Sequence, residues 1–127
     1  MPTWKLNTKF TFDSAHYIEG YDGKCARMHG HNYKVKITAE SNELHPSKYL
    51  KTADMVCDFN ELTWASKQSP KGGLDHGVLN DLMPVNTTAE RIAEFIHKET
   101  KKRIPESIHL TVTVWETDNS WVEYTDD

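Results

Sequence analysis

Alternating hydrophobic and polar positions predict two strands near the start of the chain. From Trp4 to Phe12, the apolar side chains stand at even positions with polar residues between them. From Tyr33 to Ala39, the apolar side chains stand at odd positions. A period of two is typical of a strand with one buried face. Since no helical pattern separates the two segments, we expect them to pair in antiparallel fashion.

The same alternation returns towards the other end of the chain. Between residues 108 and 114, the apolar side chains again stand at even positions and predict a third strand. Residues 121–124 predict a fourth strand, which follows the turn-forming sequence Asp-Asn-Ser at residues 118–120.

Two helices are predicted between these pairs of strands. Asp58 is a candidate N-cap with Glu61 in the first turn, and the Ser-Pro-Lys-Gly-Gly sequence at residues 69–73 would end that helix. The segment Thr87-Thr88-Ala89-Glu90 has the form of a capping box with Thr87 as the N-cap. Apolar residues at helical spacing follow it, and Pro105 ends the run.

The order of these elements is ββ-αα-ββ. It predicts an α+β fold, with a four-stranded antiparallel sheet whose apolar face is covered by two helices. Segments 17–28 and 41–54 are expected to be loops, and residues 74–83, which show no clear period, are expected to be a loop with a helical turn. Because the sequence contains neither a repeat nor a linker, we expect residues 1–127 to form a single domain.

Composition and charge narrow the classes of partner. The net charge of −4 gives no basic surface of the kind that binds nucleic acid, so no nucleic-acid partner is expected. The sequence shows neither a long apolar run nor a secretory signal, so we expect no membrane partner and a cytoplasmic location. In that compartment, Cys25 and Cys57 are expected to be reduced thiols.

Three histidines continue the apolar faces of the first two strands. His16 has the even phase of the first strand, and His29 and His31 have the odd phase of the second. If no bulge intervenes, antiparallel pairing brings all three side chains together at one end of the sheet. Glu116 has the even phase of the third strand and continues the same face. The pattern therefore predicts three imidazoles that converge near a carboxylate.

Three converging imidazoles match the ligand preference of zinc, and three protein ligands leave a fourth position for water or substrate. The alternative is that His29-Gly30-His31 is a turn with two incidental histidines. Cys25 lies in a polar loop close by and is a candidate nucleophile or base, since a thiol beside a metal or an imidazole loses its proton more readily. An inert thiol and a zinc ligand are the other interpretations of Cys25.

Asp75-His76 places a carboxylate beside an imidazole, the pair that orients and relays a proton in catalytic triads. Adjacent Asp and His residues also occur by chance. Glu116 at a buried strand end requires a hydrogen-bond donor, because an unpaired buried carboxylate is costly. A ligand with two adjacent N–H groups would satisfy it through two parallel hydrogen bonds. The alternative is an ordinary exposed glutamate at a strand end.

These residues resemble the 6-pyruvoyltetrahydropterin synthase and 6-carboxytetrahydropterin synthase family over nearly the whole chain. The segments that carry the resemblance are Phe12-Asp13-Ser14-Ala15-His16, Cys25 with His29-Gly30-His31-Asn32-Tyr33, Asp58-Phe59, Leu74-Asp75-His76, Leu79-Asn80, Thr88-Ala89-Glu90 and Glu116. The resemblance implies the tunnelling fold and a homohexamer whose active sites are shared between subunits.

The resemblance also implies a role for each candidate residue. Zinc would be held by His16, His29 and His31. Proton transfer would be carried out by Cys25, Asp75 and His76. Glu116 would anchor a pterin and Thr88 would contact it, with helix capping as the alternative role of Thr88. Where the family commonly reads Pro-Thr-x-Glu-Asn, this chain has Thr87 and Arg91 at the first and last positions.

The spacing around the thiol bears on the reaction. Ala26, Arg27 and Met28 separate Cys25 from His29, which is similar to the bacterial 6-carboxytetrahydropterin synthases of queuosine biosynthesis. The resemblance thus implies a zinc-dependent lyase that converts 7,8-dihydroneopterin triphosphate to 6-carboxy-5,6,7,8-tetrahydropterin, acetaldehyde and triphosphate. A 6-pyruvoyltetrahydropterin synthase, whose gap is usually longer, is one alternative. A non-catalytic pterin- or metal-binding module is the other.

Overall fold

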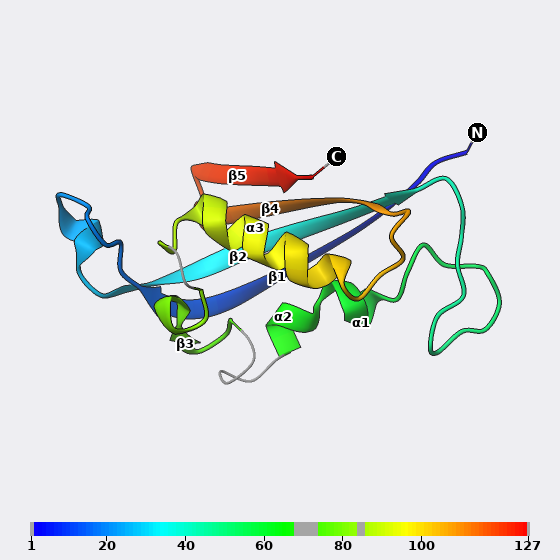
Figure 1. Cartoon of the computed structure of the whole chain (residues 1–127), viewed down its shortest axis with the longest axis horizontal. Coiled ribbons are helices and arrows are strands. Elements are labelled where there is room, and N and C mark those ends of the chain that lie inside the picture. The colour runs from blue at the N-terminus through cyan, green and yellow to red at the C-terminus, as the bar shows by residue number, and fades with distance from the viewer. Residues whose placement is uncertain (1, 68–73, 84–85, 127) are drawn as a thin grey trace.

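The computed structural model describes residues 2–67, 74–83 and 86–126 (Figure 1). Its strands are β1 (Trp4–His16), β2 (His29–Ser41), β3 (Gly77–Val78), β4 (His109–Thr117) and β5 (Ser120–Thr125). Its α-helices are α1 (Phe59–Leu62), α2 (Trp64–Lys67) and α3 (Ala89–Lys101). Two short 3-10 helices are η1 (Lys24–Ala26) and η2 (Leu79–Asp81).

The strands form one mixed sheet in the order β3-β1-β2-β4-β5. Neighbouring strands are antiparallel except that β3 runs parallel to β1, where Ser14 pairs with Gly77 and Ala15 with Val78. The α+β class is confirmed, but the predicted four-stranded, purely antiparallel sheet in ββ-αα-ββ order is not. Two residues are too few to show an alternating pattern, and β3 is held by a tertiary contact in which the Ser14 hydroxyl donates to the Gly77 carbonyl at 2.7 Å.

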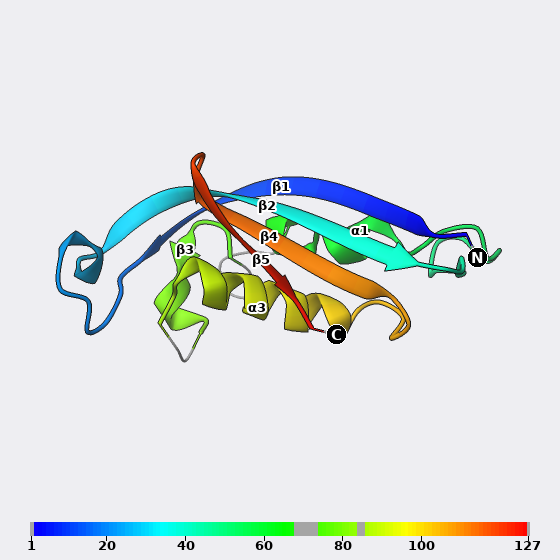
Figure 2. The same cartoon turned by 90° about the horizontal axis from the view of Figure 1, so that it is seen from above.

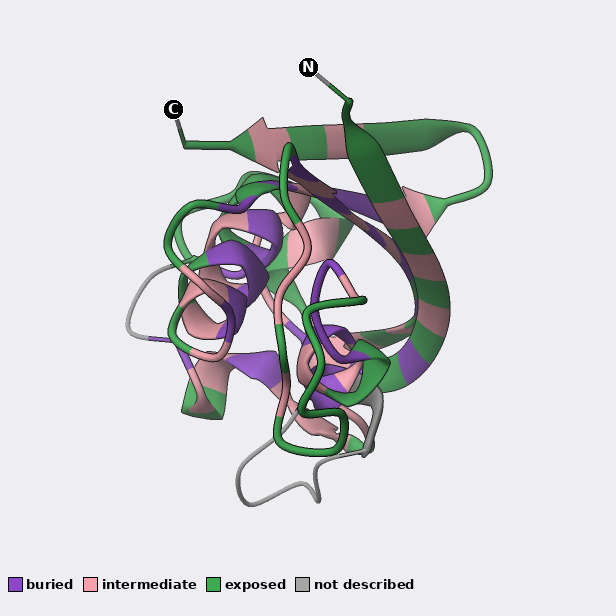
Figure 3. Cartoon of the chain, turned by 90° about the vertical axis from the view of Figure 1, so that its right-hand side faces the viewer, coloured by how far each residue is buried: buried purple, intermediate pink, exposed green. Residues whose placement is uncertain are grey.

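The long β1–β2 pair keeps one register from Trp4 opposite Ser41 to His16 opposite His29. Burial therefore alternates along both strands with the phase predicted from the sequence, as the striped ribbons in Figure 3 show. Even positions of β1 and odd positions of β2 face the core, where Phe12 and Tyr33 are almost completely buried. Because the register is uninterrupted, the phase reaches the histidines at the strand ends.

The helices lie on the concave side of the curved sheet (Figure 2). Helix α3 packs against β4 and β5 and buries Ile92, Ala93 and Ile96. His97 is also buried, with its Nε2 atom 3.1 Å from the carbonyl oxygen of Leu110. The inner stripe predicted for this helix thus covers the core side of the sheet. No helix within the described ranges is long and apolar enough to cross a membrane.

The start of α3 differs from the prediction by one residue. The N-cap is Thr88, whose hydroxyl accepts a hydrogen bond from the Arg91 amide at 3.2 Å, and not Thr87. The buried Thr87 hydroxyl is instead directed at β1 and the residue after it, since it donates to the Tyr17 carbonyl at 3.2 Å and lies 3.1 Å from Nδ1 of His16. The sequence pattern does not show which of two adjacent threonines caps the helix, because contacts with distant residues determine it.

The first predicted helix consists of two short helices, α1 and α2. Its predicted N-cap is confirmed, since the Asp58 carboxylate accepts a hydrogen bond from the Asn60 amide at 2.8 Å. The predicted break at residues 69–73 lies outside the described residues.

Candidate active site

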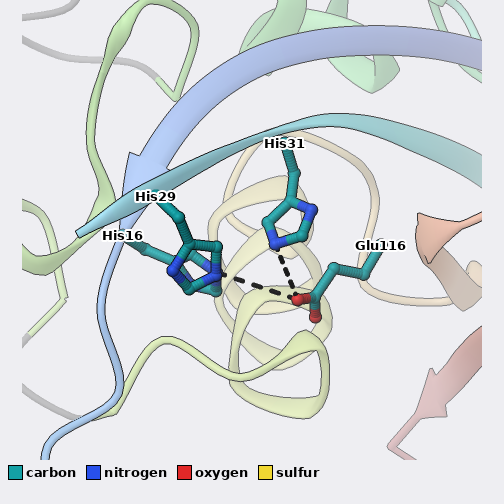
Figure 4. Close-up of side chains that lie close together, drawn as sticks. All are labelled: His16, His29, His31 and Glu116. Carbon is teal, nitrogen blue, oxygen red and sulfur yellow. Dashed lines mark ion pairs between the residues drawn. The ribbon is translucent and has the colours of Figure 1, made fainter. Parts of the chain in front are cut away.

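Pairing of β1 with β2 brings the three histidines together (Figure 4). His16 and His29 are register partners, and His31 follows on the same face of β2. The centroid of the His16 ring lies 4.5 Å from that of His29 and 5.2 Å from that of His31. The centroids of the His29 and His31 rings are 4.9 Å apart. One ligand atom from each histidine and one from Glu116 all lie within 4.8 Å of one another. The predicted convergence is present, and the role of these residues as metal ligands stays a prediction.

Backbone carbonyls fix the orientation of two of the imidazoles. The Nδ1 atom of His16 lies 2.8 Å from the Thr87 carbonyl oxygen, and the Nδ1 atom of His29 lies 2.6 Å from the Arg27 carbonyl oxygen. A carbonyl accepts only, so each Nδ1 carries the proton and each Nε2 presents a lone pair. Histidines that ligate metals are held in this way by a second hydrogen bond on the other ring nitrogen.

The nitrogens that face the centre of the cluster lack hydrogen-bond partners. The Nε2 atoms of His16 and His31 are buried and, among the described residues, neither has one. The Glu116 Oε1 atom lies 3.0 Å from Nε2 of His31 and 3.8 Å from Nε2 of His16, but these approaches are not hydrogen bonds. Three nitrogens and a carboxylate directed at one point form a donor set that fits a divalent metal such as zinc.

Burial keeps the innermost imidazole neutral. Loss of solvent lowers the pKa of His16, against the opposing effects of the Thr87 carbonyl and the Glu116 carboxylate. A neutral imidazole retains the lone pair that a metal requires. His16 is therefore in the protonation state of a ligand near pH 7.

Cys25 lies on η1, in the loop that extends beyond the ends of β1 and β2 (Figure 1). Its carbonyl accepts a hydrogen bond from the Ile18 amide at 2.7 Å, and its side chain is half-buried. Within the described part of the chain, its sulfur joins neither group of potential metal ligands. Cys57 differs, because burial, and then Asp58 and Glu61, raise its pKa to about 11. Cys57 is thus an inert core thiol, whereas Cys25 is accessible.

Asp75 and His76 form a second polar cluster with Asp13. The Asp75 carboxylate accepts a hydrogen bond from the Asp13 amide at 2.9 Å and lies 2.7 Å from Nδ1 of His76. The hydrogen bond from the Asp13 amide, and then that from His76, lower the pKa of Asp75. The carboxylate therefore stays ionised and orients the ring, leaving Nε2 of a largely exposed His76 side chain free to exchange a proton.

His76 also has an unusual backbone conformation. Its φ of 60° lies in the left-handed region, which non-glycine residues seldom adopt. Such a conformation persists where surrounding contacts impose it, here through the His76 amide, which donates to the Asp13 carbonyl at 2.5 Å. Strained residues of this kind cluster at functional sites.

Comparisons with known proteins show the family of this chain. The model of the 6-pyruvoyl tetrahydropterin synthase family matches residues 5–127. This chain belongs to that family. It is 33% identical to the 6-carboxy-5,6,7,8-tetrahydropterin synthase of Haemophilus influenzae, over 95% of this chain and 98% of the relative. It is 31% identical to the synthase of the same name from Synechocystis, over 95% of this chain and 92% of the relative.

Two further similarities bear on fold and reaction. The solved structure of Caenorhabditis elegans 6-pyruvoyl tetrahydropterin synthase covers 100% of this chain and 98% of its own with a TM-score of 0.74, and at 21% identity it supports the fold alone. The human 6-pyruvoyl tetrahydrobiopterin synthase is 33% identical over 80% of this chain and 70% of the relative. Membership of this family makes the chain an enzyme that acts in pterin chemistry.

Within one chain, the histidine cluster and the cluster of Asp13, Asp75 and His76 lie on opposite faces of the sheet. Ligand atoms of the Asp13, Asp75 and His76 side chains lie within 4.8 Å of one another. The Asp13 side chain has the odd, outward phase of β1, whereas His16 has the even, core-facing phase. A hollow of about 390 Å³ beside Asp13 is lined by Asn32 and His76 and also by His31. The structure therefore brings the three histidines together with Glu116 but does not bring Asp75 and His76 to them.

Two residues of the site are not predicted as such by the sequence. The Thr87 hydroxyl lies 3.1 Å from Nδ1 of His16, and the Tyr33 ring lies 5.4 Å from the His31 ring and 5.9 Å from the His16 ring. Tyr33 shares the odd phase of the histidines on β2, which marks it as core but does not indicate a polar role. The contact of Thr87 depends on the fold, because a long stretch of chain separates it from His16.

Proposed function

We propose that this enzyme is a zinc-dependent 6-carboxytetrahydropterin synthase. It would convert 7,8-dihydroneopterin triphosphate to 6-carboxy-5,6,7,8-tetrahydropterin, acetaldehyde and triphosphate, in queuosine biosynthesis. The observation that carries this proposal is the convergence of His16, His29 and His31 around Glu116. Relatives that carry the synthase name along nearly their whole length support the same reaction.

Three histidines would hold the metal in the proposed site. His16, His29 and His31 each present Nε2 towards one point, and the carbonyls of Thr87 and Arg27 keep two of the rings in place. Zinc, when bound there, supplies a Lewis acid that stabilises developing negative charge on the oxygens of the substrate side chain. Glu116 stands beside this position and is free to accept hydrogen bonds from the substrate.

The remaining residues would bind the ring and move protons. We assign to Glu116 the two adjacent N–H groups of the pterin, which match a carboxylate through parallel hydrogen bonds. Thr88, half-buried at the start of α3, would contact the same ring. The Cys25 thiolate would remove and return protons on the side-chain carbons, while His76, oriented by Asp75, would exchange a proton with the thiol.

An active site shared between subunits would bring together residues that lie on opposite faces of the sheet in one chain. Asp75 and His76 lie beside the outward-facing Asp13 side chain, on the face opposite the histidines, so we propose that this pair meets Cys25 of a neighbouring subunit in a homohexamer of the tunnelling fold. Two open edges of the sheet are available for assembly. Among the described residues, β3 covers β1 only at Ser14 and Ala15, and β5 pairs only with β4. Open edges of this length favour pairing with another chain.

The thiol provides a direct test of this function. In the metal-loaded Cys25→Ala variant, turnover of 7,8-dihydroneopterin triphosphate should fall at least about a hundredfold, because general acid–base groups contribute on that order. Metal content and the circular dichroism spectrum should match the wild type. Cys57→Ala is the matched control and should keep its activity, because Cys57 is buried in the core and, among the described residues, belongs to neither group of potential ligands. Full turnover by Cys25→Ala would overturn the proposed role of the thiol.

A second candidate function is formation of 6-pyruvoyltetrahydropterin. The similarity to the human 6-pyruvoyl tetrahydrobiopterin synthase favours it, although it covers less of the chain than the similarity to the carboxy-forming relatives. The two reactions share the substrate and differ in whether a carbon–carbon bond is broken. Analysis of the products distinguishes them.

A further inference from the structure

The hydroxyl of Tyr33 is buried without a partner. Tyr33 has no exposed surface, and its Oη atom forms no hydrogen bond within the described residues. Buried polar groups in native proteins are almost always hydrogen-bonded, and a tyrosine placed in a core usually directs its hydroxyl to a partner. Since a phenylalanine would fill the same space without this cost, the unpaired hydroxyl requires an explanation.

The surroundings of Tyr33 belong to the proposed metal site. Its ring stacks on Phe12 at a centroid distance of 4.9 Å, and it makes edge contacts with the rings of His31 and His16 at 5.4 and 5.9 Å. Tyr33 follows His31 on the core-facing side of β2. The phenol is therefore packed directly against two of the three proposed ligands.

Glu116 is the neighbour of Tyr33 on the next strand. The last β2–β4 register pair is Lys34 with Trp115, and Tyr33 and Glu116 are the next residues along the two strands. The Glu116 carboxylate reaches the core-facing side, because its Oε1 atom lies 3.0 Å from Nε2 of His31. Tyr33 also contacts His31, with a distance of 5.4 Å between the two ring centroids, so the Tyr33 and Glu116 side chains meet the same imidazole and lie within reach of each other. A phenol is a donor at neutral pH, and a carboxylate is an acceptor.

When the histidines bind a metal, they offer Glu116 no hydrogen-bond donor. In the structure, its Oε1 atom lies beside the Nε2 atoms of His31 and His16. Nitrogens that direct their lone pairs to a metal have no hydrogen to give to a carboxylate. The carboxylate then requires another group to hold it against rotation, and the Tyr33 hydroxyl is an unused donor on the adjacent strand.

We propose that Tyr33 is a positioning residue that donates a hydrogen bond to Glu116 in the loaded enzyme and thereby directs the carboxylate towards the pterin ring. This inference rests on the proposed function, because it assigns the pterin N–H groups to Glu116. A phenol–carboxylate hydrogen bond is charge-assisted and therefore among the stronger kinds. It keeps the carboxylate oriented before the substrate arrives, so that less freedom is lost on binding.

Tyr33→Phe removes only the hydroxyl and tests this role. The KM for 7,8-dihydroneopterin triphosphate should rise about tenfold while kcat changes less than about twofold, because the lost interaction orients a binding group. The dissociation constant of 7,8-dihydroneopterin, measured by fluorescence, should rise by a similar factor. The melting temperature of the metal-free protein should stay the same or increase, since a buried unpaired group is removed.

Two companion variants show whether the effect passes through Glu116. Tyr124→Phe is the matched control, because Tyr124 is a half-buried tyrosine of β5 that packs against His97 of α3, away from the site. The KM of the Tyr124→Phe variant should equal that of the wild type. Glu116→Gln should weaken binding of 7,8-dihydroneopterin by itself. Adding Tyr33→Phe to Glu116→Gln should then weaken it little further, because residues that act through one interaction are not additive.

Each remaining outcome counts against the inference. A Tyr33→Phe protein that binds 7,8-dihydroneopterin as the wild type does but melts at a lower temperature would assign the hydroxyl to the core. Full additivity with Glu116→Gln would show that Tyr33 does not act through Glu116. If the wild type binds and converts the pterin and Tyr33→Phe does so equally well, only this inference fails. If the wild type does neither, the proposed function fails and the inference falls with it.

Discussion

At the scale of single residues, the site depends on which nitrogen of each imidazole is already bonded. His16 and His29 use Nδ1 for contacts with backbone carbonyls, and this leaves Nε2 to face the centre of the cluster. The backbone therefore selects the tautomer as well as the direction of the ligands. His16 receives an additional contact from the hydroxyl of Thr87.

Replacement of Thr87 tests this orienting contact. Thr87→Val keeps the shape of the side chain and the carbonyl at 2.8 Å but removes the hydroxyl at 3.1 Å from His16. We expect the affinity for zinc to fall about tenfold, as for other outer contacts of metal ligands. Competition with a chromophoric chelator measures it.

Thr100→Val is the matched control for Thr87→Val. Its buried hydroxyl accepts a hydrogen bond from Nε1 of Trp64 at 2.9 Å, far along α3 from the metal site. This variant should lose stability and keep its zinc affinity. A Thr87→Val protein that binds zinc as tightly as the wild type would contradict the orienting role.

At the scale of elements, alternation determines most of the architecture. Strands β1, β2, β4 and β5 are predictable because period two is a property of each segment alone. Extended to the strand ends, the same phase places His16 with His29 and His31, and the uninterrupted register makes that extension valid. Pattern alone therefore predicts the convergence of the three imidazoles.

The features that escape prediction depend on contacts between distant segments. β3 forms because it pairs with β1 at Ser14. Thr87 contacts His16 because the segment before α3 passes the end of β1. The polar environment of Tyr33 likewise requires the position of Glu116 on another strand. None of these contacts leaves a periodic signal in the sequence. They become visible only with the fold.

The packing of α3 on the sheet predicts a pH dependence of stability. Burial lowers the pKa of His97 below its usual value of 6.5, against the opposing hydrogen bond to Leu110. The unfolded chain therefore binds more protons at this residue below about pH 6.5, and the free energy of unfolding should fall as the pH is lowered from about 7.5 to about 5.5. Urea unfolding at a series of pH values measures this decline.

Variants on α3 isolate the contribution of His97 to this pH dependence of stability. His97→Gln should show a shallower decline with falling pH than the wild type. Ile96→Val, the neighbouring buried residue, should lower stability by a similar amount at every pH, because it removes no titratable group. An unchanged decline in His97→Gln would show that this histidine is not the source.

At the scale of the whole molecule, the position of the two clusters predicts an active site that needs two chains. The histidines and Asp75-His76 stand on opposite faces of one sheet, so a single chain does not complete the proposed proton relay. Homo-oligomerisation through the open edges of β1 and β5 would bring them together.

Mixing two inactive variants tests the shared site. Cys25→Ala and His76→Ala should each lack activity, and co-refolded mixtures should recover up to about a quarter of wild-type turnover, because random assembly regenerates some intact sites. Mixing without refolding is the control and should recover nothing. Recovery absent from a co-refolded, fully assembled mixture would show that each site is built from one chain.

The central claim concerns the product, and one measurement tests it most directly. Purified, zinc-loaded protein should convert 7,8-dihydroneopterin triphosphate into 6-carboxy-5,6,7,8-tetrahydropterin together with an equal amount of acetaldehyde, both identified by mass spectrometry. The carboxy-forming relatives and the histidine cluster support that outcome. Formation of 6-pyruvoyltetrahydropterin with neither acetaldehyde nor the carboxypterin would contradict it.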